Sequence, residues 1–117
     1  MGKYFIGSDL YRLAFPDGEW VDLKQEFSQA DTDYITAQML TAKMSTEGKK
    51  TPVMEAEMNF GKQATLERAI VAWSFADNGT PILVTPENIS NLRSKYRTQI
   101  LAKVDLLAEQ ANAFSKN

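Results

Sequence analysis

Carboxylates are the only side chains in this sequence whose number and spacing could support catalysis. Glu55 and Glu57 alternate along one short stretch, and Asp31 and Asp33 stand close together where a helix is expected to begin. Paired acids can hold a hard metal ion or cleave a glycosidic bond. Neither pair has the spacing of an EF-hand loop or of a catalytic motif. A solvated strand face and the positive end of a helix account for them, so we predict no catalytic residue.

Two residue types are missing altogether, because the 117 residues include no cysteine and no histidine. The chain therefore lacks thiol nucleophiles, disulfides, the usual zinc ligands and the commonest general base. Its glycines stand alone, so there is no Gly-rich phosphate loop either. We expect a protein that is not an enzyme and that binds neither a metal ion nor a cofactor.

The charge of the chain is close to balanced, with a net charge of −2 and a pI near 5.1. Arg93 and Arg97 share one helical face with Lys95 and Lys103 nearby, which is typical of a phosphate-binding strip or of an ordinary solvated face. The overall acidity favours the solvated face. The first residues lack the apolar run of a signal peptide, and no run is long enough to cross a bilayer. We expect no nucleic-acid or membrane partner and a location in the cytoplasm.

The length fits one domain with one core. The pattern predicts an α+β fold in which a β-hairpin and one further strand form a small antiparallel sheet, packed with about four helices including a long C-terminal one. The expected segments are a hairpin region over 1–27, a helix over 28–45, an exposed loop over 46–52, a strand over 53–60 and a mainly helical remainder over 61–117.

The hairpin prediction depends on the alternation of Tyr11, Leu13 and Phe15 onto one face, followed by turn residues. In the turn Pro16-Asp17-Gly18-Glu19, proline presets φ and glycine supplies a permissive position. The returning strand begins at Trp20. Further on, Ser28 or Asp31 caps a helix that runs to about Met44, and the pair resembles a capping box.

The stretch 53–60 has a period of two, because Met54, Ala56, Met58 and Phe60 point one way. That alternation predicts a half-buried strand beside the hairpin. Methionine, glutamate and alanine are weak strand formers, so a helix extending back toward Met54 remains the rival interpretation.

The centre of the chain predicts a helix, a turn and a second helix. Leu66, Ala69, Ile70 and Trp73 recur at helical spacing. The turn signal that follows is Asp77-Asn78-Gly79, and Thr85-Pro86-Glu87 has the chemistry of a helix start. Past Leu92 the chain reads as helical almost to its end, with a seam at Ile100, Val104, Leu107, Ala111 and Phe114.

Two apolar faces are candidates for binding another protein. The first is on the helix over 28–45, where Met39, Leu40 and Met44 form an adaptable surface. The second is on the last helix, where Leu101, Leu107 and Phe114 form a partner-binding or self-associating face. The alternative is that all of these residues fill the interior of the monomer.

The central stretch also resembles a known group of proteins. The residues that carry the resemblance are Glu67 to Phe75, then Asp77-Asn78-Gly79, Pro81-Ile82, Thr85 to Ile89 and Leu92. An aliphatic-Trp-Ser helix end, a D-x-G-x-P turn and a T-x-E-x-I-x-x-L helix start are together similar to the small tail assembly proteins of long-tailed bacteriophages. The segment from Phe15 to Leu23 is similar to the hairpin that opens several small phage tail or head–tail proteins.

The resemblance implies a tail assembly chaperone. Such proteins are encoded near the tape-measure protein and are thought to coat it and to recruit tail-tube subunits. The implied partner is therefore a phage tape-measure or tail-tube protein, with self-association left open. The alternative is a structural virion component, such as a tail terminator, neck or head–tail connector subunit, which would be found in the virion.

Overall fold

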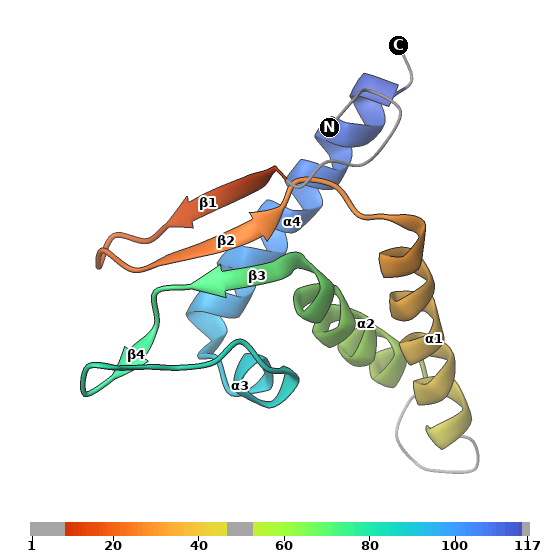
Figure 1. The fold of residues 1–117 in the computed structure, drawn as a ribbon. Helices are drawn as coiled ribbons and strands as arrows, with labels where there is room; N and C mark the ends of the chain where they lie inside the picture. The colour runs from red at the N-terminus through yellow and green to blue at the C-terminus, as the bar shows by residue number, and fades with distance from the viewer. Residues whose placement is uncertain (1–8, 47–52, 116–117) are drawn as a thin grey trace.

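The computed structural model describes residues 9–46 and 53–115, and it confirms the α+β class (Figure 1). A three-stranded antiparallel sheet has the order β1-β2-β3, and a separate two-stranded hairpin joins β4 to β5. The strands are β1 (Leu10–Ala14), β2 (Trp20–Lys24), β3 (Ile70–Trp73), β4 (Ala76–Asp77) and β5 (Thr80–Pro81). The helices are α1 (Gln29–Thr46), α2 (Val53–Ala69), α3 (Pro86–Ser90) and α4 (Ser94–Ser115).

The predicted N-terminal hairpin is confirmed as β1 and β2. Gly18 adopts a positive φ of 90° in the turn, and the Asp17 carboxylate accepts a hydrogen bond from the Glu19 amide at 3.0 Å. The register places Tyr11 opposite Leu23 and Leu13 opposite Val21 on the same face of the sheet. That face is the one that packs into the core.

The core lies between this face of the sheet and α4, which crosses behind the three strands in Figure 1. Strand β2 contributes two fully buried side chains, and the end of α2 and the first half of α4 cover them. The main members are Val21, Leu23, Leu66, Ala69, Ile70, Trp73, Ile89, Ile100, Val104 and Leu107. The opposite face of the sheet has no helix over it in Figure 1 and carries Arg12, Trp20 and Asp22.

The predicted strand over 53–60 is wrong, because these residues form the first half of α2. The third strand of the sheet is instead Ile70–Trp73, which the helical spacing of Leu66, Ala69, Ile70 and Trp73 had placed in a helix. The residue types explain both differences. Methionine, alanine and glutamate favour a helix over a strand, whereas Ile-Val-Ala-Trp is rich in strand formers. The predicted loop over 46–52 falls almost wholly outside the described residues.

The turn and helix-start signals of the central stretch are confirmed. Asn78 and Gly79 both have positive φ, at 51° and 82°, and connect β4 to β5 as a two-residue hairpin turn. Thr85 caps α3, since its side-chain oxygen accepts a hydrogen bond from the Asn88 amide at 3.1 Å and Pro86 takes the first helical position.

We expect Gly79→Ala to destabilise the protein by about 1 kcal/mol, because an alanine is strained at positive φ. A Cβ at this position would meet no atom within 4 Å, so the cost is one of backbone conformation alone. Urea unfolding of the variant measures it. Asn78→Gly is the matched control, and we expect it to leave the stability nearly unchanged.

Helices α1 and α2 form an antiparallel pair that stands out from the sheet and α4 (Figure 1). We call this pair the helical arm. The radius of gyration is 15.7 Å, whereas a compact chain of this length has about 13 Å. The molecule is also flat, with extents of 46 × 44 × 20 Å. The arm therefore exposes helix surface that a compact packing would have covered.

Candidate protein-binding surface on the helical arm

The base of the arm is fixed by the buried carboxylate of Asp31. Its Oδ1 atom accepts hydrogen bonds from Lys24 Nζ at 2.9 Å and from Arg68 Nε at 2.7 Å. The other oxygen accepts from the Ser28 amide at 3.0 Å, while Ser28 Oγ accepts from the Asp31 amide. The predicted capping box is thus confirmed, and one carboxylate joins the end of β2, the start of α1 and the end of α2.

The electrostatics of this cluster favour the ionised carboxylate. Burial alone would raise the pKa of Asp31, but hydrogen bonds from Lys24, the Ser28 amide and Arg68 outweigh it and lower the pKa to about 2. The side chain of Asp31 is only 2% exposed. Asp31 is therefore a structural anion that orients the arm, and it is separated from Asp33, which is exposed and accepts from Gln29.

The two helices of the arm meet through small side chains. Ala42 and Ala64 are buried, and so is Gly61. A Cβ added to Gly61 would lie 3.2 Å from both Cγ and Sδ of Met39, so Met39 packs against the backbone of α2. At these positions the inner face of α1 is in close contact with α2.

The outer face of α1 carries two large apolar side chains. Leu40 is 57% exposed and Met44 is 68% exposed. They are four residues apart and therefore lie one above the other on the helix. Along α1, Ile35, Met39 and Ala42 face inward, whereas Ala37, Leu40 and Met44 face solvent, so the three residues of the predicted first face are divided between the two sides.

A groove of about 530 Å³ runs along the other side of the arm, between α1, α2, α3 and the start of α4. Phe60, which is 43% exposed, and Ala64 supply its apolar surface. Gln63 Nε2 donates to Glu67 at 2.8 Å and to the Pro86 carbonyl at 3.1 Å, so α2 and α3 are joined at the rim.

Two further contacts rigidify this groove. Arg97 donates to Gln63 Oε1 at 3.1 Å and to the Ile89 carbonyl at 2.9 Å. The Tyr34 hydroxyl donates to Glu67, which raises the pKa of Tyr34. Arg97 is thus engaged within the protein, which fits a structural role rather than a free phosphate-binding strip.

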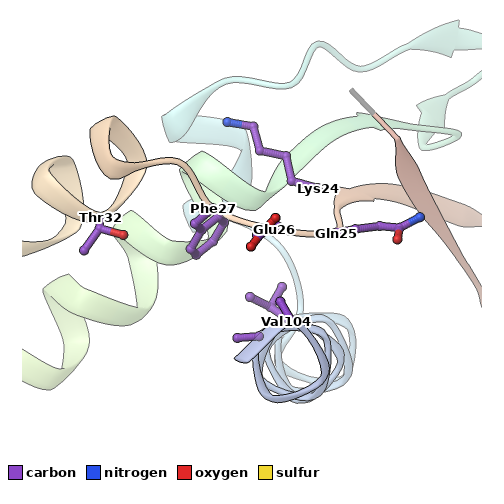
Figure 2. Close-up of a pocket in the computed structure, with 8 residues that line it drawn as sticks. Lys24, Gln25, Glu26, Phe27, Thr32 and Val104 are labelled. Carbon is purple, nitrogen blue, oxygen red and sulfur yellow. The ribbon is translucent and has the colours of Figure 1, made fainter. Parts of the chain in front are cut away.

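A second hollow, of about 220 Å³, lies between the β2–α1 linker and the second half of α4 (Figure 2). Val104 points from α4 toward the linker that carries Phe27, whereas Lys24 and Gln25 point away from it. Ala108 and Ala111 complete the α4 wall. Leu101 and Leu107, which were predicted to form the second binding face, are not among the residues that line this hollow.

The structure distributes the six predicted binding residues over different environments. Leu40 and Met44 are exposed, and Met39 is half-buried against α2. Leu107 is 7% exposed and Leu101 packs against the core, so these two belong to the interior, as the alternative interpretation allowed. The side chain of Phe114 falls outside the described part of the chain, as do those of Glu55 and Glu57.

Sequence reasoning missed two exposed apolar residues of α2, Met58 and Phe60. They were assigned to one face of a half-buried strand beside the hairpin. The rival helical interpretation contains the signal that could have found them, because Phe60, Ala64 and Glu67 recur at helical spacing and line one groove.

Within 9–46 and 53–115, no group of three or more acidic side chains could hold a metal ion. In the same ranges no helix is long and apolar enough to cross a membrane. The groove beside α2 combines an aromatic ring with the Gln63 amide, which already hydrogen-bonds to Glu67, the Pro86 carbonyl and Arg97. Its apolar surface is therefore available for packing, while the polar groups of Gln63 have partners within the protein.

Comparisons with known proteins add no assignment. No family model matches the chain, and no curated protein sequence and no solved structure is significantly similar to it.

Proposed function

We propose that this protein is a non-enzymatic bacteriophage tail assembly protein, a chaperone whose helical arm covers apolar surfaces of the tape-measure or tail-tube protein. The observation that carries the proposal is the pair Leu40 and Met44, exposed one turn apart on a helix whose opposite face is already packed. A helix with one face in the fold and large apolar side chains on the other suits docking against a second apolar helix.

The chemistry of these side chains fits a holding role. Methionine is flexible and polarisable, so it can pack against partners of varied shape. Burying the exposed parts of Leu40 and Met44 would supply about 2–4 kcal/mol, and association costs at least that much. One copy would therefore bind weakly. Copies that also contact one another along a long helical partner would together hold it and still be displaced by tail-tube subunits.

A titration with fragments of a tape-measure protein from the same genome tests the proposal. We expect the wild-type protein to bind and Leu40→Glu/Met44→Glu to lose at least tenfold in affinity, because two charges would have to be desolvated in the contact. Leu83→Glu is the control, since Leu83 is 73% exposed but lies outside the arm. Absence of binding by the wild-type protein, alone or as an oligomer, would count decisively against a chaperone.

The alternative, a structural virion component, makes the opposite prediction about finished particles. A chaperone leaves the tail once assembly is complete, whereas a terminator, neck or connector subunit stays. Mass spectrometry of purified virions therefore separates the two roles. Detection of the protein in purified virions, at the copy number of one ring of subunits per particle, would favour the structural role.

A further inference from the structure

The outer edge of β1 carries main-chain groups that the sheet leaves unpaired. The Phe15 amide donates to the Glu19 carbonyl at 2.8 Å, and the Ser74 amide donates to the Trp20 carbonyl at 3.0 Å on the other side of β2. Because hydrogen bonding alternates along antiparallel strands, the amide and carbonyl groups of Arg12 and Ala14 point away from β2. In the part of the chain that the structure describes, no hydrogen bond from elsewhere reaches these groups.

The usual protections of a sheet edge are missing from this strand. Its register with β2 is regular over five residues, whereas the pairing of β2 with β3 contains a bulge. The one charge on β1 is turned back onto the sheet, because Arg12 donates to both oxygens of Asp22, at 2.8 and 3.1 Å, and stacks over Trp20 at 3.7 Å. A regular edge without bulge, proline or outward charge is a template for another strand.

We propose that two copies of this protein pair antiparallel through β1 about a two-fold axis at Arg12, forming one continuous six-stranded sheet. This register places Leu10 of each copy opposite Ala14 of the other and Arg12 opposite its own counterpart. It is the pairing that matches the three outward-facing residues of β1, Leu10, Arg12 and Ala14, with one another, so each outward amide meets a carbonyl. The Leu10 carbonyl already accepts a hydrogen bond from Gln25 Nε2 at 3.3 Å, and its second lone pair would accept the Ala14 amide of the other copy.

The side chains of β1 are complementary to themselves in this register. Leu10, which is 42% exposed, meets the small Ala14 on the open face of the sheet. Tyr11 and Leu13, both half-buried at the edge of the core, become cross-strand neighbours on the other face. The two Arg12 side chains would repel each other alone, but each is paired with its own Asp22. The row Asp22–Arg12–Arg12–Asp22 is therefore neutral, which favours a second copy over an unrelated strand.

Introduced cysteines test the register, because the chain has no cysteine of its own. In Arg12→Cys the two new side chains would lie on the axis with Cα atoms about 5.5 Å apart, within disulfide range. In Ala14→Cys they would be about 13 Å apart and unable to join. We expect a disulfide-linked dimer from the first variant and none from the second under mild oxidation. The double variant Leu10→Cys/Ala14→Cys should also form a disulfide-linked dimer, because Leu10 of each copy lies opposite Ala14 of the other. This variant keeps the Arg12–Asp22 ion pair.

Sedimentation equilibrium of the unmodified chain tests the contact without a covalent link. Ala14→Pro removes an outward amide, and Ala14→Thr retains it. Leu10→Lys places a charge in the contact, and Leu83→Lys places the same charge elsewhere on the surface. We expect Ala14→Pro and Leu10→Lys to raise the dimer dissociation constant at least about tenfold, with their controls unchanged.

Three results would overturn the proposal. The first is that the protein stays monomeric at every concentration up to about 1 mM, because the dimer dissociation constant would then be above that value and the pairing negligible. The second is equal cross-linking of Arg12→Cys and Ala14→Cys, which would indicate random collision. The third is a dimer that Ala14→Pro leaves intact, since that dimer would use another surface. Binding of the tape-measure fragments is measured separately, so this proposal and the proposed function can fail independently.

Discussion

Replacing Asp31 by asparagine is expected to lower the free energy of unfolding by about 2–4 kcal/mol at neutral pH, and the melting temperature by about 10 °C. The carboxylate is buried and serves three donors from three segments, Lys24, Arg68 and the Ser28 amide. Asparagine preserves the size but removes the negative charge that these donors share. Urea unfolding measures the loss, and Asp33→Asn is the matched control, because Asp33 is exposed in the same turn.

The lowered pKa of Asp31 also determines how the destabilisation by Asp31→Asn should depend on pH. The pKa of Asp31 is about 2 in the folded state, below its ordinary value of 3.8, so the ionised group stabilises the fold at every pH above about 4. That stabilisation, about 2.5 kcal/mol, is lost as the pH falls from about 4 toward 2. We therefore expect the stability difference between wild type and Asp31→Asn to be constant from pH 5 to 7 and to shrink toward pH 2. A difference that persists at pH 2 would show that the charge is not its source.

Local signals in the sequence predicted the parts of this fold that depend on local chemistry. Gly18, the Asn78-Gly79 pair and the Thr85 cap lie where turn and capping chemistry placed them, because each satisfies backbone groups within a few residues. The reciprocal pair Ser28 and Asp31 was predicted as a cap. Its contacts with Lys24 and Arg68 were not, because they join segments that are distant in sequence.

The parts that could not be predicted depend on which surfaces meet in three dimensions. The segments around Met58 and Trp73 each fit both a helical and a strand periodicity. Around Met58, apolar residues alternate as in a strand, but the segment is part of helix α2. Around Trp73, apolar residues recur at helical spacing, but Ile70–Trp73 is strand β3. Likewise, the sequence could not separate Met39 from Leu40. These adjacent residues point in different directions from α1, and only the position of α2 decides that Met39 faces inward while Leu40 faces solvent.

We expect truncation of a core leucine to lower the free energy of unfolding far more than truncation of a leucine on the arm. Leu66 is fully buried near the end of α2, in the same hydrophobic cluster as Leu23, Ile70 and Ile100. Leu66→Ala removes those contacts and leaves a cavity, so we expect a loss of about 3 kcal/mol. Leu40→Ala is the same chemical change at a side chain that is 57% exposed, and we expect it to cost less than about 0.5 kcal/mol.

The pair of variants also separates the fold from the proposed binding. Leu66→Ala should weaken binding of tape-measure fragments only under conditions in which part of the protein is unfolded, and a lower temperature should restore it. Leu40→Ala should weaken binding at every temperature while circular dichroism and the unfolding curve stay unchanged. If Leu40→Ala instead lowered stability as much as Leu66→Ala does, Leu40 would be buried in solution. The outer face of α1 would then be covered by another part of the protein or by a second copy, and it could not be a surface kept open for a helical partner.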